Sequence, residues 1–495
     1  MTDNKTDNRI ILGCVADDFT GASDAASFLV KGGMETALFN GIPMGEPELS
    51  KISAVVIALK TRSCDPALAA EESLKAFEWL KAQGASLLYF KYCSTFDSSD
   101  SGNIGPVIDA VLEKYSIPYT ILCPALPVNG RTVSGGRIYV NGSLLEDSPM
   151  RYHPVTPMLR SSVADLMSVQ GKYPCIDLGR VREAADEGEG TVTETGRPSR
   201  CLSEQQQKTI ENICGCHEHF YIVPDYETDE DGRRIAECFG SLKFITGGSG
   251  LLEHLGRLLA FKQGDPETSS SSEAKAHSTK DASEAKAPKS KKSSEETAQR
   301  TKENTDARRN DSFTLILAGS CSKATLGQIE CFESEGNTSF RISPEAVLEG
   351  EISASTLWEQ INDTACSRKL SCLLVYSSAP ENETARVKEK YGSRAAKEIE
   401  GFMAEIGCFA YKNGIRNIIV AGGETSGAVA GRLGFEGFRI GESAAPGVPV
   451  MIPLGAEAVR LVLKSGNFGQ RSFFSDTVRL LRGCVKADQK PEKAC

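Results

Sequence analysis

Short apolar runs alternate with amphipathic stretches along nearly the whole chain, and this alternation constrains the fold more than any other feature. Stretches 67–80 and 104–114 have the spacing of amphipathic helices, and they lie between apolar runs of strand length. Strands that alternate with helices at this spacing build largely parallel sheets. We therefore predict an α/β protein, with strands at 10–16, 54–58, 87–92, 119–124, 220–224, 242–246, 314–318, 372–376, 417–421 and 448–454.

The chain has 495 residues, more than one hydrophobic core usually organises. Between residues 265 and 311 it contains no Val, Leu, Ile, Met, Phe, Tyr, Trp or Cys. Such a segment cannot bury enough apolar area to offset the entropy of ordering it. We expect two α/β domains with largely parallel sheets and a ligand cleft between them. Their predicted bounds are 10–262 and 313–483, with a disordered low-complexity insertion at 263–312 and a flexible tail at 484–495.

Charge and hydropathy exclude several classes of partner. The net charge is −10, which argues against nucleic acid, and no apolar run approaches the roughly 20 residues that span a bilayer. The first residues, MTDNKTDNR, lack the pattern of a signal peptide. The 16 cysteines are spread along the chain, and several lie inside apolar runs. We expect a cytoplasmic protein with small-molecule partners, and a homodimer is one open state of assembly.

Two adjacent carboxylates, Asp17 and Asp18, follow the first apolar run in the segment GCVADDFTGASDAASFLV at 13–30. Open α/β sheets bind ligands at the carboxyl ends of their strands. Carboxylates accept hydrogen bonds from hydroxyl groups, and one of them can take a proton as a general base. The alternative is a purely structural role, in which Asp18 or Thr20 caps the following helix.

Two cations end the next predicted strands. Arg62 lies in ALKTRSCD, and Lys91 begins the segment KYCSTFD with Cys93 and Ser94. In a parallel sheet these strand ends share one edge with Asp17. Together the groups suit a small polyhydroxy acid, although a strand-end cation is often simply solvated.

The C-terminal half contains turns of a different kind. In the segment IIVAGGETSGAVAGRLG, Gly422 and Gly423 separate a strand from a helix that begins near Thr425. Free N–H groups at a helix start favour phosphate. Similar turns contain Ser320 and Gly466, so we predict a nucleotide site here. The chain has neither G-x-x-x-x-G-K-[ST] nor an early G-x-G-x-x-G, which disfavours a P-loop enzyme and a dinucleotide dehydrogenase.

The segment CGCHEHF contains the ligand types of a zinc site. Its candidates Cys214, Cys216, His217 and His219 lie within six residues, and ligands packed this closely rarely close a tetrahedron. We expect no metal site built from protein side chains.

Five motifs of the chain together resemble the four-carbon acid sugar kinases. They are ADDFTGA, FKYCSTFDS with GNIGP, CPALPVNGRTV, HPVTPM and AGGETSGAV, and they extend through both predicted domains. The KYCS form at 91–94 is similar to the 3-oxo-tetronate kinase branch. The insertion is not part of the family pattern.

The resemblance implies a phosphotransferase with an alcohol group as acceptor. The domain at 10–262 would bind the acid sugar and the domain at 313–483 would bind ATP with Mg²⁺. The γ-phosphoryl group would pass to the C4 hydroxyl of a 3-dehydro-erythronate-type acid. Asp18 is favoured over Asp17 as the base. The implied substrate set is Asp17, Asp18, Arg62, Lys91, Tyr92, Cys93 and Ser94, and the implied nucleotide set is Ser320, Gly422, Gly423, Glu424, Thr425 and Gly466.

Two other functions stay open at this point. A kinase for D-threonate or D-erythronate differs by one hydrogen-bonding partner on the substrate, and the stereochemical series is also open. A non-catalytic protein that binds nucleotide or metabolite is the second alternative, although the acidic and glycine motifs are both intact.

Overall fold

The computed structural model describes residues 10–98, 100–152, 156–183, 202–264, 313–392 and 394–488. Residues 265–312 of the expected insertion and 489–495 of the expected tail lie outside this range. Two helices continue past the domain ends expected from the sequence, at residues 262 and 483. Helix α8 spans Gly250–Gly264 and α16 spans Phe473–Asp488.

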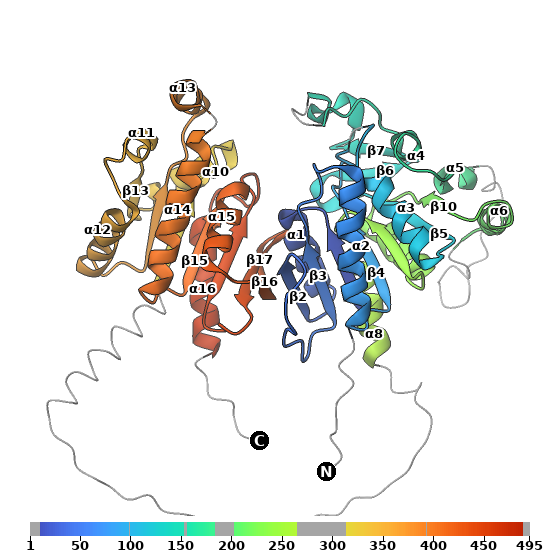
Figure 1. Cartoon of the computed structure of the whole chain (residues 1–495), viewed down its shortest axis with the longest axis horizontal. Coiled ribbons are helices and arrows are strands. Elements are labelled where there is room, and N and C mark those ends of the chain that lie inside the picture. Colours follow the sequence, from blue (N-terminus) through green and yellow to red (C-terminus); the bar gives the residue numbers. More distant parts are fainter. Residues whose placement is uncertain are drawn as a thin grey trace, which may run out of the picture.

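Strands and helices alternate as the sequence predicts, and the α/β prediction is confirmed (Figure 1). The strands of the N-terminal half are β1 Leu12–Ala16, β2 Thr36–Asn40, β3 Ala54–Ala58, β4 Leu87–Lys91, β5 Tyr119–Cys123, β6 Arg131–Ser134, β7 Arg137–Val140, β8 Ser143–Leu144, β9 Cys175–Asp177, β10 Phe220–Val223 and β11 Phe244–Gly247. Its other helices are α1 Phe19–Lys31, α2 Pro66–Ala82, α3 Ile104–Tyr115, α4 Val163–Ser168, α5 Leu178–Glu183, α6 Glu204–Cys214 and α7 Asp229–Phe239.

The C-terminal half follows the same alternation. Its strands are β12 Thr314–Ala318, β13 Ser339–Arg341, β14 Cys372–Tyr376, β15 Asn417–Ala421, β16 Gly437–Ala445, β17 Val448–Pro453 and β18 Arg460–Lys464. Its other helices are α10 Lys323–Ser334, α11 Pro344–Leu348, α12 Ala354–Ser367, α13 Glu381–Tyr391, α14 Arg394–Lys412 and α15 Gly423–Leu433.

Strands β6, β7 and β8 form a small antiparallel sheet of their own. The other strands of the two halves form one continuous sheet, which the sequence did not predict. Its order is β13-β14-β12-β15-β18-β17-β16-β2-β3-β1-β4-β11-β5-β10-β9. Each half is parallel, and the antiparallel pairs lie at the junction, where β16 pairs with β2 and β17 pairs with β16 and β18. The pairing of Phe438 with Leu38 joins segments about 400 residues apart, which no local pattern reveals. The prediction of largely parallel sheets holds for each half.

Strand direction reverses across this junction. Three successive antiparallel pairs, β2–β16, β16–β17 and β17–β18, make the parallel strands of the two halves run in opposite directions. A sheet twists by about 20–25° per strand, so the six steps between β1 and β15 amount to roughly 120–150°. The twist therefore brings the two carboxyl edges toward one side. Figure 1 shows β6 and β7, which follow one edge, and α13, which follows the other, at the top of the view.

The hairpin formed by β16 and β17 also packs against α1. The hydroxyl groups of Ser27 and Ser443 lie 2.8 Å apart, and a Cβ placed on Gly447 would lie 2.4 Å from Oδ1 of Asp24. Asp24 is buried, and its other carboxyl oxygen accepts a hydrogen bond from Ser249. A segment of the C-terminal half thus contacts α1, the helix that Asp18 caps.

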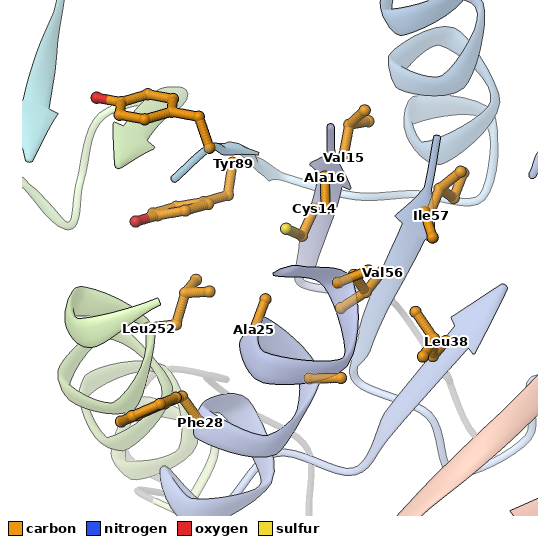
Figure 2. Packing of buried hydrophobic residues seen from close by; sticks show 14 of the residues in the cluster. Cys14, Val15, Ala16, Ala25, Phe28, Leu38, Val56, Ile57, Tyr89 and Leu252 are labelled. Carbon is orange, nitrogen blue, oxygen red and sulfur yellow. The ribbon is translucent and has the colours of Figure 1, made fainter. Parts of the chain in front are cut away.

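The core of the N-terminal half lies on both faces of β1. All five residues of this strand are buried, as expected when helices cover both faces of a parallel sheet. Figure 2 shows Cys14 on the side of Ala25, Phe28 and Leu252, which belong to α1 and α8, whereas Val15 points the opposite way. Burial raises the pKa of the Cys14 thiol, which acts here as a small apolar side chain.

Among the described residues, none of the helices combines the length and the apolar character needed to cross a membrane.

Candidate active site

The carboxyl ends of β1, β3 and β4 lie side by side. Ala16 pairs with Ala58 on one neighbour and with Lys91 on the other. The next residues, Asp17 and Asp18, therefore start at the same edge as Lys91 and the loop that contains Arg62. Backbone bonds tie this loop down, because the amides of Thr61 and Arg62 both donate to the carbonyl of Asp17.

Arg62 contacts both aspartates. Its Nε and Nη2 atoms donate to the two carboxyl oxygens of Asp17 at 3.0 and 2.7 Å, and Nη1 lies 2.8 Å from Oδ2 of Asp18. The Asp17 side chain is 3% exposed and that of Asp18 is 30% exposed. Burial acts against the guanidinium charge, but the two carboxylates outweigh it and raise the pKa of Arg62. The sequence-predicted cluster thus contains a buried carboxylate, a cation and a second carboxylate open to a ligand.

Lys91 completes this cluster beside Gly21. Its side chain is buried, and Nζ donates to the carbonyl of Tyr92 at 2.9 Å. A Cβ placed on Gly21 would lie 2.5 Å from Oδ1 of Asp18, 3.0 Å from Nζ of Lys91 and 3.7 Å from Nη2 of Arg62. Only a residue without a side chain leaves room for these groups to converge.

Asp18 also caps α1. It has extended backbone angles, and its Oδ1 accepts a hydrogen bond of 2.7 Å from the amide of Gly21. Thr20, the alternative cap, lies within the helix. The capping role and a ligand role are compatible, because each carboxyl oxygen can accept a further hydrogen bond and the side chain is partly exposed.

The three residues after Lys91 differ in orientation. Tyr92 is fully buried, and its hydroxyl lies 3.2 Å from that of Thr246, so its side chain lies in the core rather than at the site. Cys93 and Ser94 are partly buried, and Sγ of Cys93 lies 3.1 Å from the hydroxyl of Thr95. Tyr92 therefore contacts the cluster only through its main-chain carbonyl, which accepts the hydrogen bond from Lys91.

A cavity of about 290 Å³ lies in the C-terminal half, at the carboxyl ends of β12 and β15. It is lined by five of the six residues of the predicted nucleotide set: Ser320, Gly422, Gly423, Glu424 and Thr425. The sixth, Gly466, lies directly behind them, since a Cβ placed on it would be 2.1 Å from Oγ of Ser320.

Close backbone approaches explain the glycines of this cavity. Gly422 has φ +128°, and a Cβ on it would lie 3.1 Å from the amide nitrogen of Ser320. A Cβ on Gly319 would lie 2.1 Å from Oγ1 of Thr425. Gly422 stands at the start of α15, and no side chain caps that helix. A helix start without a side-chain cap is of the kind that can bind an anion.

The remaining walls of the cavity come from α11, α13 and α14, and the sequence analysis missed them. Pro344, Val387 and Ile399 provide apolar surface, and Glu400 provides a carboxylate. Burial and the neighbouring carboxylate of Glu424 raise the pKa of Glu400. These residues lie far apart in the sequence on ordinary amphipathic helices, so no motif marks them.

The CGCHEHF segment does not form a metal centre. Cys214 and Cys216 are exposed, whereas His219 is buried with its Nδ1 atom 2.8 Å from the carbonyl of Ile117. Within the described ranges, no group of three or more His, Cys, Asp or Glu residues is arranged to hold a metal ion.

Family models match both halves of the chain. A sugar-binding N-terminal domain matches residues 12–255, and a nucleotide-binding C-terminal domain matches residues 315–474. The acidic cluster lies within the first match and the glycine-lined cavity within the second.

Known proteins match over nearly the full length. The 3-oxo-tetronate kinase of Haemophilus influenzae is 35% identical over 466 residues, which cover 94% of this chain and 98% of the relative. That of Cupriavidus necator is 34% identical over 490 residues, which cover 98% and 100%. A solved structure from Salmonella typhimurium LT2 matches with a TM-score of 0.76 and 33% identity, over 95% of this chain and 99% of that one. The chain therefore belongs to the 3-oxo-tetronate kinases, a branch of the four-carbon acid sugar kinase family.

Proposed function

We propose that the protein transfers the γ-phosphoryl group of ATP to the C4 hydroxyl of a 3-oxo-tetronate and releases the 4-phosphate. The observation that carries this proposal is the convergence of Asp17, Asp18, Arg62 and Lys91 around Gly21. This cluster lies in the half matched by a sugar-binding domain, and the glycine-lined cavity lies in the half matched by a nucleotide-binding domain.

The two cations and two carboxylates suit different parts of the acid. Arg62 and Lys91 would bind the carboxylate of the substrate, because planar and point-like cations both pair with that group. Asp17 is nearly inaccessible and uses both carboxyl oxygens on Arg62, so its role is to orient the guanidinium. Asp18 is 30% exposed and can reach a hydroxyl of the ligand. We therefore assign Asp18 as the acceptor of the C4 hydroxyl proton.

The nucleotide would lie in the cavity of the C-terminal half. The amides at the start of α15 and the turns around Ser320 and Gly466 would hold its phosphates. The apolar surface of Val387 and Ile399 suits a purine ring. Because the described residues offer no cluster of metal ligands, the Mg²⁺ that accompanies ATP would depend chiefly on phosphate oxygens.

Phosphoryl transfer depends on position and charge more than on covalent chemistry by the protein. We infer that the two ligand edges close on each other to form the cleft between the halves. Closure would exclude water and so limit hydrolysis of ATP.

A coupled assay that measures ADP release from Mg-ATP tests this function. The acceptors are the 3-dehydro-erythronate and 3-dehydro-threonate isomers, D-threonate and D-erythronate, and a reaction without acceptor is the blank. We expect turnover with a 3-oxo acid only. Turnover confined to a reduced acid would keep the kinase activity and reassign the substrate. ATP binding with no turnover across the panel would favour the non-catalytic alternative.

The variants Asp18→Asn and Asp17→Asn test the roles of the two carboxylates. We expect kcat to fall by roughly 10²–10⁴-fold in Asp18→Asn, the usual contribution of a general base. Asp65→Asn is the matched control, since Asp65 caps α2 as Asp18 caps α1 and is exposed. Wild-type kcat in Asp18→Asn would refute the assignment of the base, and wild-type kcat in Asp17→Asn would contradict its role in orienting Arg62.

A further inference from the structure

Lys464 ends β18 with a buried ammonium group that belongs to neither predicted ligand set. Its side chain is 1% exposed. Nζ donates to Oγ1 of Thr325 at 3.2 Å and to the carbonyls of Ser465 and Gly466 at 3.1 and 3.0 Å. All three acceptors are neutral, and in the described part of the chain Lys464 forms no ion pair with a carboxylate.

A buried charge without a counter-charge is unfavourable. Burial lowers the pKa of Lys464 to about 8. The groups that face it from α10 and α16 are the Thr325 hydroxyl and the ring of Phe473, 5.7 Å from Nζ, and neither titrates in this range. Helix α15 also packs against β18, and its charged residues are Glu424, which lines the cavity, and Arg432, which pairs with Glu405. Charged side chains of these helices form exposed pairs instead, as in Arg471–Glu330 and Arg479–Asp476.

Lys464 lies directly behind the turns of the nucleotide cavity. It pairs in the sheet with Ala421, and its carbonyl accepts a hydrogen bond of 2.9 Å from the amide of Gly422. The carbonyl of Gly466 accepts hydrogen bonds from Lys464, from Oγ of Ser322 at 2.7 Å and from Oγ1 of Thr325 at 2.9 Å. The ammonium of Lys464 thus holds the turn at Ser465 and Gly466, and its main-chain carbonyl holds the turn at Gly422.

We propose that the phosphates of the bound nucleotide supply the counter-charge that Lys464 lacks, so that nucleotide binding and protonation of Lys464 are coupled. Lys464 is then a positioning residue whose charge contributes to affinity. The inference rests on the proposed nucleotide site.

The direction of the coupling follows from the signs of the charges. In the free protein the ammonium loses its proton near pH 8, and a bound polyanion makes that loss harder. Binding must therefore take up a proton from the buffer above this pH, and protonation must favour binding to the same extent. The dissociation constant should rise by roughly tenfold between pH 7 and pH 9, because the deprotonated protein must first regain a proton.

Isothermal titration calorimetry of the full chain with Mg-ATP, without acid substrate, measures this coupling. Titrations at pH 7.0, 8.0 and 9.0 in buffers of different ionisation enthalpy give the number of protons taken up. We expect almost none at pH 7.0 and close to one at pH 9.0. Adenosine, which has no phosphate, is the ligand control and should bind without proton uptake. The phosphates of Mg-ATP have pKa values below this range and do not contribute.

Two variants isolate the lysine. Lys464→Arg keeps the charge at every pH used, so its affinity should not change between pH 7.0 and 9.0 and no proton should be taken up. Lys464→Met has no charge and should bind Mg-ATP at least tenfold more weakly at pH 7.0, again without proton uptake. The wild-type measurement needs neither variant to fold.

The outcomes separate this inference from the proposed function. Wild-type protein that binds Mg-ATP with constant affinity and no proton uptake up to pH 9.0 would overturn the coupling and leave the nucleotide site standing. Folded protein that binds no Mg-ATP at any pH would overturn the nucleotide site itself, and this inference with it. Proton uptake that persists in Lys464→Arg would assign the coupling to another group and refute the role of Lys464.

Discussion

Replacement of Gly21 by alanine tests the two roles of the Asp18 carboxylate, which caps α1 and is the proposed base. Activity reports the second role and stability reports the first. The added methyl carbon would lie 2.5 Å from Oδ1 of Asp18, about 0.9 Å closer than the 3.4 Å at which ordinary contact begins, and 3.0 Å from Nζ of Lys91. Asp18 must therefore move by nearly 1 Å. A displacement of this size at a reacting group can reduce the rate by about 10²-fold.

The expected change in stability is small, because two effects cancel. Alanine in place of glycine inside a helix stabilises by about 1 kcal/mol, whereas loss of the hydrogen bond from the amide of Gly21 to Asp18 costs about 1 kcal/mol. Gly401→Ala is the matched control. This glycine lies in the middle of α14, is exposed, and has no atom within 4 Å of an added Cβ, so the variant should gain about 1 kcal/mol.

Steady-state kinetics and urea denaturation of both variants test this reasoning. We expect Gly21→Ala to lose about 10²-fold in kcat/KM for the acid while its KM for ATP stays unchanged. Its unfolding midpoint should lie near that of the wild type, and that of Gly401→Ala should lie above it. Activity of Gly21→Ala within threefold of wild type would mean that the chemistry does not depend on the position of Asp18.

Three further substitutions probe other parts of the structure. Gly466→Ala would place a Cβ 2.1 Å from Oγ of Ser320, so kcat/KM for ATP should fall by roughly a hundredfold in initial-rate measurements. An unchanged kcat/KM would mean that this turn does not contact the nucleotide. Gly447→Ala combines φ +75° with a Cβ 2.4 Å from Oδ1 of Asp24, and urea denaturation should show a loss of about 1–3 kcal/mol. Burial raises the pKa of Asp24 above its ordinary value of 3.8, so its ionisation disfavours the folded state at neutral pH. Asp24→Asn should therefore raise the denaturation midpoint at pH 7.5, with a gain that shrinks toward pH 4. A gain that is independent of pH would point to packing instead.

The site could be predicted from the sequence where a strand and its functional side chains lie in the same short segment. The run that ends at Ala16 predicts β1, and Asp17 and Asp18 follow it directly, so the register of a parallel sheet was enough to expect Lys91 beside them. The glycine turns that line the cavity of the C-terminal half could be expected for the same reason, since Gly422 lies between a strand and a helix.

Features that depend on distant contacts were not predictable in this way. Strand β2 is as long as β1 and β3, but its partner β16 contains glycine, glutamate and serine among its apolar residues, so their pairing has no local signature. Tyr92 follows Lys91, but only the structure shows that its ring lies in the core. The burial of Lys464 was not predictable, because a lysine at a strand end is usually solvated and only the packing of α10 and α16 around it removes it from solvent.

The reversal of strand direction at β16 and β17 has a mechanical consequence. Register shifts interrupt the pairing of these strands between Ile440 and Ala445, and such irregularities increase local twist. A change of twist at this hairpin would rotate the strands of one half relative to those of the other, so we expect substitutions here to alter how the two carboxyl edges face each other. Residues of this hairpin, which lie in neither proposed ligand site, would then affect how the acid and the nucleotide are aligned. Substitutions intended to alter that alignment would begin here.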